Sequence, residues 1–149
     1  MSGLAISLMM QVSLLSADAH GQSYSQAYRQ MQSDGQPLLI LVGADWCPGC
    51  VTMKRSVMPR LESAGKLGGV HFATVDVDAD SDLAEQLMRG GTIPQLIVYS
   101  KTASGWHREQ FTGAVHESSV EALIRRAEAA QQSARTAAAH RSVSESGGN

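Results

Sequence analysis

Cysteine is scarce in this chain. Cys47 and Cys50, both in the segment "DWCPGC", are the only two thiols among 149 residues. Closing so short a loop removes little chain entropy, so a disulfide here would be an inefficient structural staple. A structural zinc site needs four ligands, and the chain has neither a second CxxC nor histidines at H-x3–5-H spacing. We therefore expect no zinc site, although two thiolates could still bind Cu(I).

Runs of basic residues are also missing. The chain has 12 Lys and Arg against 14 Asp and Glu, and no more than two basic residues are adjacent. Nucleic-acid-binding proteins need a basic patch, so we expect no nucleic-acid partner. With 43% hydrophobic residues in 149, the chain can bury one ordinary core, which predicts a single domain.

The N-terminal segment contains an uncharged run that is too short to span a bilayer. Leu4–Leu15 has twelve residues, whereas a spanning helix needs about 20. The small residues Ala17 and Ala19 follow, an order that resembles a signal peptide (residues 1–19) cleaved after Ala19. A basic start is missing, since the first basic residue is Arg29. We expect an exported, periplasmic or secreted protein without stable membrane insertion after cleavage. The alternatives are a buried or frayed N-terminal segment and a cytoplasmic location.

Hydrophobic periodicity and turn residues divide the expected domain, residues 20–128, into eight elements in the order α-β-α-β-α-β-β-α. The expected elements are a helix over 23–32, a strand over 38–43, a helix over 48–65 that Pro59 ends or kinks, a strand over 69–78, a helix over 80–91, strands over 94–100 and 105–113, and a helix from 118. Alternating strands and helices imply parallel pairs, and the closing hairpin adds an antiparallel edge. The sequence thus predicts an α/β fold with a central four-stranded mixed sheet flanked by helices.

The last segment, residues 129–149, is rich in Ala, Ser and Gly. Because Ala favours helix, we expect the last helix to extend into this tail. We expect the final ten residues to be disordered.

The position of the CxxC pair favours redox chemistry. Cys47 follows a buried strand and begins a helix, where unpaired N–H groups and the helix dipole favour the nucleophilic thiolate. Cys50 lies nearly one turn later and can resolve a mixed disulfide in a fast intramolecular step. We therefore expect Cys47 to attack and Cys50 to resolve.

Residues around the two sulfurs are candidates for substrate binding. Pro48 fixes the backbone between the cysteines, and Gly49 keeps the surface open. Trp46 would form a flat apolar shoulder beside the nucleophile, or else an anchor packed on the sheet edge. Asp45 is expected to be exposed, and Lys54 either reaches the site or is an ordinary surface lysine.

The motif resembles the thioredoxin superfamily. "ADWCPGC" follows "LLILV", and "GTIPQLIVY" comes later, a likeness that covers residues 22–128. It is most similar to small exported thioredoxin-like proteins that begin with a helix. The resemblance implies that Pro94 is cis and lies against the CxxC, and that the backbone of Ile93 pairs with an incoming substrate. A simple strand-start proline is the alternative for Pro94.

Two positions depart from the family. Thioredoxins carry a buried Asp where this chain has Leu41, and a Lys on the neighbouring strand where it has Thr74. The proton relay of thioredoxin therefore cannot be transferred to this chain. The motif also lacks the histidine that oxidases and isomerases use to stabilise the thiolate. This favours the reducing half of the superfamily range, which spans about −270 to −120 mV.

We expect a protein thiol–disulfide oxidoreductase, specifically a protein disulfide reductase in cell redox homeostasis. No cofactor and no metal is expected. The partners would be protein or small-molecule disulfide substrates and an unidentified electron-donor thiol. The alternatives are a disulfide oxidase or isomerase, and a non-enzymatic thiol binding module that carries a partner or Cu(I).

Overall fold

A four-stranded sheet organises residues 22–146, the part of the chain that the computed structural model describes. Its strands are β1 (Leu38–Gly43), β2 (His71–Asp76), β3 (Gln95–Thr102) and β4 (Gly105–Thr112), in the order β2-β1-β3-β4. β1 pairs parallel with β2, while β1 with β3 and β3 with β4 pair antiparallel. The predicted α/β fold with a mixed four-stranded sheet is confirmed. The suggested signal peptide, residues 1–19, lies outside the described residues.

The direction of β3 differs from the parallel pairing that the alternation of strands and helices implied. β2 ends beside the end of β1, with Asp76 opposite Gly43. The intervening helix α4 (Ser81–Leu87) has 7 residues, about 10 Å of length at 1.5 Å per residue. A six-residue strand is about 20 Å long. The short helix α4 therefore cannot bring the chain back to the end of the sheet where β1 and β2 begin. β3 therefore starts where β2 ended and runs antiparallel to β1.

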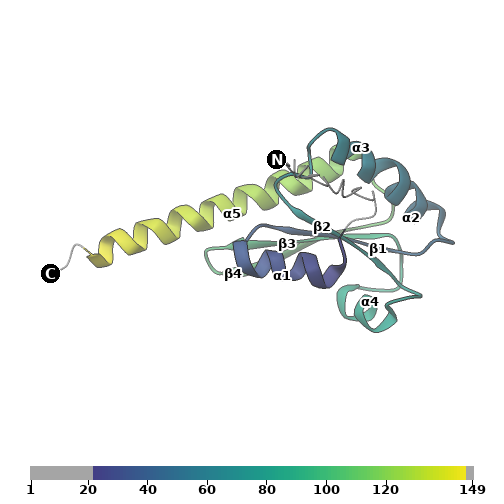
Figure 1. Ribbon diagram of the computed structural model, residues 1–149, viewed down its shortest axis with the longest axis horizontal. Helices are drawn as coiled ribbons and strands as arrows, with labels where there is room; N and C mark the ends of the chain where they lie inside the picture. The colour runs from purple at the N-terminus through teal and green to yellow at the C-terminus, as the bar shows by residue number, and fades with distance from the viewer. Residues whose placement is uncertain (1–21, 147–149) are drawn as a thin grey trace, which may run out of the picture.

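Helices cover both faces of the sheet (Figure 1). On one face lie α1 (Tyr24–Asp34) and α4, packed on Leu38, Ile40 and Val42 of β1. On the other lie α2 (Pro48–Thr52), η1 (Met53–Val57), α3 (Met58–Ser63) and the first part of α5 (Glu117–Ser146). Successive β1 residues thus enter two separate apolar clusters, as expected for a central strand buried on both faces.

The helix that follows the cysteines does not end at Pro59. It runs from α2 through the π-helical turn η1 into α3, and the Met58 N–H donates to the Met53 carbonyl across that wider turn. Pro59 has no N–H to donate, so an ordinary α-helical ladder would be interrupted here. The π turn directly before the proline lets the helix continue past it.

Helix α5 is much longer than its contact with the sheet. Its buried side chains are Val120, Leu123, Ile124, Ala127, Gln131 and Ala134. After these the helix projects away from the body of the molecule and reaches Ser146 (Figure 1). Residues 140–146, which we expected to be disordered, are helical, in line with the high helix propensity of the alanines before them. Within residues 22–146, no helix combines the length and the apolar character that crossing a membrane requires.

Candidate redox site

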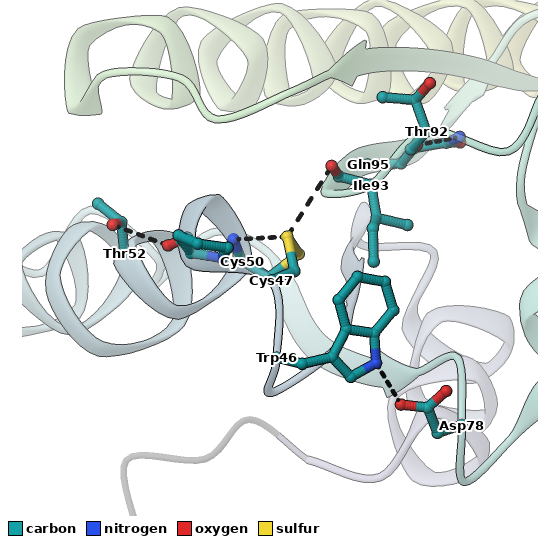
Figure 2. The surroundings of a disulfide bond; sticks show 9 residues. Trp46, Cys47, Cys50, Thr52, Asp78, Thr92, Ile93 and Gln95 are labelled. Carbon is teal, nitrogen blue, oxygen red and sulfur yellow. Dashed lines mark hydrogen bonds between the residues drawn. A yellow bond between two sulfur atoms is a disulfide. The ribbon is translucent and has the colours of Figure 1, made fainter.

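Cys47 and Cys50 form a disulfide at the N-terminus of α2 (Figure 2). Cys47 is the N-cap residue, and the Cys50 backbone N–H donates to the Cys47 Sγ at 3.2 Å. This hydrogen bond comes from the first turn of the helix, where N–H groups lack intrahelical partners. When the pair is reduced, the same N–H is placed to stabilise a thiolate on Cys47.

The second cysteine is packed against the end of β1. A Cβ atom at Gly43 would come within 2.8 Å of the Cys50 Cβ and 2.9 Å of its Sγ. Only glycine therefore leaves room for the Cys50 side chain at this point. This role of Gly43 was not predicted from the sequence, although a glycine closing an apolar strand just before the motif was a visible signal.

The loop before β3 lies against the cysteines, as predicted. The Ile93–Pro94 peptide bond is cis, and the Ile93 carbonyl oxygen lies 3.9 Å from the Cys47 Sγ. The Pro94 ring lies over Gly49, because a Cβ at Gly49 would meet the Pro94 Cδ at 3.4 Å. Gly49 and Pro94 thus permit the close approach of two distant segments, so Pro94 has more than the role of a strand-start proline.

Gln95 holds this loop in place, a role that was not predicted from the sequence. It is fully buried, although it is polar. Its Nε2 donates to the carbonyls of Arg89 and Thr92 at 3.1 and 3.0 Å, and its Oε1 accepts the Arg89 N–H at 3.1 Å. The side chain therefore replaces the backbone partners that the loop lacks. No periodicity in the sequence signals such a contact.

Trp46 forms an exposed shoulder rather than a packed anchor. Its side chain is 68% exposed, and its indole Nε1 donates to Asp78 Oδ2 at 2.7 Å. Figure 2 shows the ring beside Ile93 and next to Cys47. Trp46 and Ile93 line a groove of about 470 Å³ with Val77 and Met88. Asp78 orients the indole and is, after Gly43 and Gln95, the third site residue that was not predicted from the sequence.

A small cavity of about 40 Å³ lies on the inner side of Cys50, between the helix and the sheet. Leu41 and Thr74, the two positions that depart from the thioredoxin pattern, both line it. The charged residues of its wall are Asp45, Lys54 and Asp76. Asp45 is exposed, as expected, and its Oδ1 accepts from Lys54 Nζ at 3.2 Å. Lys54 thus reaches the site. Among the described residues, no three His, Cys, Asp or Glu side chains gather to form a metal site.

Comparisons with known proteins agree with this geometry. Residues 19–101, more than half of the chain, match the family model described as thioredoxin-like. None of the curated proteins with which the chain was compared matches it.

Among solved structures, a thioredoxin from Thermus thermophilus is similar at 21% identity and a TM-score of 0.59, covering 72% of this chain and 85% of that one. Chloroplastic thioredoxin z is similar at 20% identity and 0.59, covering 74% and 94%. Trichomonas vaginalis thioredoxin is similar at 22% identity and 0.57, covering 74% and 98%. Identities this low support the fold alone.

Proposed function

Because the chain belongs to the thioredoxin-like family, we propose that it is a protein disulfide reductase acting by dithiol–disulfide exchange through Cys47 and Cys50. The observation that carries the proposal is the CxxC pair at the N-terminus of α2, with the Cys50 N–H directed at the Cys47 Sγ. The thioredoxin-like fold and this pair together support a thiol–disulfide oxidoreductase.

In the proposed reaction Cys47 is the nucleophile. Its thiolate attacks one sulfur of a substrate disulfide, and the other substrate sulfur leaves as a thiolate. Cys50 then attacks the Cys47 Sγ, which releases the second substrate thiolate and forms the Cys47–Cys50 disulfide. Two electrons pass to the substrate, and an electron-donor thiol of unidentified class restores the dithiol.

The substrate chain would lie beside the Ile93–Pro94 loop. The Ile93 carbonyl is close to the Cys47 Sγ. The carbonyls of Thr92 and Pro94 already accept from Gln95 and Gly113, so the backbone of Ile93 itself would pair with a short added strand. Trp46, Pro48 and Gly49 would form the surface around the reacting sulfur, with the groove of Trp46 and Ile93 receiving apolar substrate side chains. These substrate-binding roles belong to the proposal.

Reduction is favoured over oxidation by the residues between the cysteines. Pro48 and Gly49 offer no imidazole to stabilise the Cys47 thiolate, and a less stable thiolate makes the disulfide harder to reduce. We expect the potential of the Cys47–Cys50 couple to lie below about −195 mV, the middle of the superfamily range. A value near that of the strong oxidase DsbA, about −120 mV, would point to an oxidase instead.

Insulin reduction driven by dithiothreitol tests the enzymatic part of the proposal. The full chain should turn over many equivalents of insulin, and Cys47→Ser should not. If stoichiometric binding of a thiol partner or Cu(I) occurred without turnover, the chain would be a binding module rather than a reductase.

We also propose that the protein is exported, on the basis of the uncharged run and the small residues that end at Ala19. The mature chain should then begin near His20. Intact mass of the protein from its native host decides this, and recovery of residues 1–19 on the cytosolic protein would contradict it.

A further inference from the structure

The cavity behind Cys50 has room for water. Its volume of about 40 Å³ exceeds the roughly 10–15 Å³ that one water molecule requires. Thr74, Asp45, Asp76 and Lys54 supply polar groups to its wall. Cys50 itself is only 4% exposed. It belongs to an apolar cluster with Ala44 and Cys47, so the cavity is the polar part of its surroundings.

Both cysteines are buried, and burial makes it costly to form a thiolate on either of them. Cys50 must lose its proton before it can attack, and a buried thiolate is costly unless a positive charge or a hydrogen-bond donor is close. The Cys47 Sγ accepts the Cys50 N–H, whereas the Cys50 side chain packs against Gly43 and Cys50 lines the cavity. The stabilising group for Cys50 is therefore to be sought in the cavity wall.

We propose that Lys54 is a positioning residue whose ammonium group, held at the cavity by Asp45, stabilises the Cys50 thiolate in the resolving step. This inference rests on the proposed exchange reaction. Lys54 lies one helical turn after Cys50, on the side of the helix that faces the cavity. Its ion pair with Asp45 at 3.2 Å keeps the ammonium at the cavity.

The carboxylates of Asp45 and Asp76 in the cavity wall would destabilise a Cys50 thiolate, but two features weaken their influence. The Asp45 side chain is 67% exposed, so water screens its charge, whereas Lys54 is 32% exposed. Asp76 Oδ1 accepts the N–H groups of Asp78 and Ala79 at 2.9 and 3.2 Å, which commits that oxygen to the turn after β2. The ammonium is thus the better-covered charge of the ion pair, and Cys50 lines the same cavity.

The step balances without any further reactant. The Cys50 thiol loses its proton to solvent, and the cavity is large enough to admit a water molecule to its side of the helix. The Cys50 thiolate then forms a bond with Cys47 Sγ, while the bond between Cys47 and the substrate sulfur breaks. The substrate sulfur carries the electron pair away and takes up a proton from solvent.

Dithiodipyridine, a neutral disulfide that releases coloured thiopyridone, separates the two steps in the full-length reduced protein. With one equivalent of the reagent, the first release reports the attack by Cys47, and the second reports the attack by Cys50 on the mixed disulfide at Cys47. In Lys54→Met we expect the second release to slow by about 3- to 10-fold at pH 7, a partial effect because Lys54 is a third exposed. Its pH midpoint should rise, and the first release should be unchanged.

Two matched variants complete the experiment. Lys54→Arg keeps the charge and should restore the second release to within about twofold of the unaltered rate. Lys66→Met removes another paired lysine, which lies 3.7 Å from Glu121 and away from the cavity, and should change neither release. The inference is overturned if Lys54→Met leaves the rate and pH midpoint of the second release unchanged, or if Lys66→Met has the same effect.

The outcome also separates this inference from the proposed reductase. A chain that releases both thiopyridones but fails to turn over insulin would refute the reductase, and its Lys54 variants would still decide the role of the lysine. A chain that releases only one thiopyridone would refute both, since Cys50 would not resolve at all.

Discussion

The two sulfurs of the redox pair have different surroundings, and this difference should appear in their reactivity. Cys47 accepts a helix N–H and lies beside the Ile93 carbonyl, whereas Cys50 packs against Gly43 and lines the small cavity between helix and sheet. In the reduced protein we expect Cys47 to alkylate faster than Cys50 below about pH 8. Cys50→Ser should trap mixed disulfides with substrates. Mass spectrometry of iodoacetamide-treated protein measures the two rates, and equal rates would contradict the assignment of Cys47 as nucleophile.

Adding a single methyl group at Gly43 should lower the free energy of unfolding substantially. Gly43→Ala places a methyl group under 3 Å from Cys50. Since the atoms it meets belong to a short, buried side chain, we expect an overpacking cost of about 1–3 kcal/mol in the free energy of unfolding. Gly91→Ala is the matched control, because a methyl group there meets nothing within 4 Å. Urea unfolding of both variants measures the difference, and equal stabilities would refute the tight packing.

At the scale of elements, the features that depend on neighbouring residues in the sequence could be predicted. The apolar run of β1 and the start of α2 at Pro48 were both readable, because each depends on neighbouring residues. The helical spacing of Tyr24, Ala27, Tyr28 and Met31 predicts one buried face on α1. Ala27 and Met31 are buried, whereas Tyr28 is exposed and stacks on Tyr24.

Features that depend on distant segments could not be predicted in the same way. The antiparallel direction of β3 follows from the length of α4 measured against the strands. The support that Gln95 gives to its loop is visible only once the loop is folded. The cavity lined by both Lys54 and Cys50 forms only when the helix packs on β1 and β2, which lie apart from each other in the sequence. The cysteines and Pro94 were recognisable because the family motif records that long-range arrangement.

Helix α5 divides into a part that holds the fold and a part that does not. A chain ending after residue 138 should keep the free energy of unfolding within about 0.5 kcal/mol, because residues 139–144 of the removed segment are exposed. A chain ending after residue 130 also loses the 2.7 Å bond from Gln131 Nε2 to the Gly35 carbonyl and the buried Ala134. That should cost about 1–3 kcal/mol. Thermal unfolding of the two truncated chains compares them, and equal losses would contradict this division.

At the scale of the whole molecule, Asp34 connects three elements. Its carboxylate lies 2.8 Å from His71 Nε2 at the start of β2, and its backbone carbonyl accepts from Arg135 of α5 at 3.3 Å. Burial alone would raise the pKa of Asp34. The Gln36 N–H, His71 and Arg135 together outweigh burial, so the pKa lies below its ordinary value of 3.8.

A lowered carboxyl pKa stabilises the protein at higher pH. The contribution is fully present above the ordinary value and is lost as the pH falls through the folded-state value, below 3.8. Asp34→Asn should therefore lower stability at pH 7, and the deficit should shrink toward pH 3. Asp80→Asn is the control, because that side chain does not cap α4. Urea unfolding across this range measures both, and a deficit independent of pH would contradict the role of the charge.

The projecting end of α5 also has a practical consequence. It lies at the opposite end of the molecule from α2, which begins at the redox pair (Figure 1). At 1.5 Å per residue, the 30-residue helix is about 45 Å long. A dye, resin or electrode surface attached through residues 140–146 would therefore stand well clear of Cys47. The projecting part of α5 would act as a spacer. Immobilisation through its end would leave the two sulfurs open to large proteins in solution.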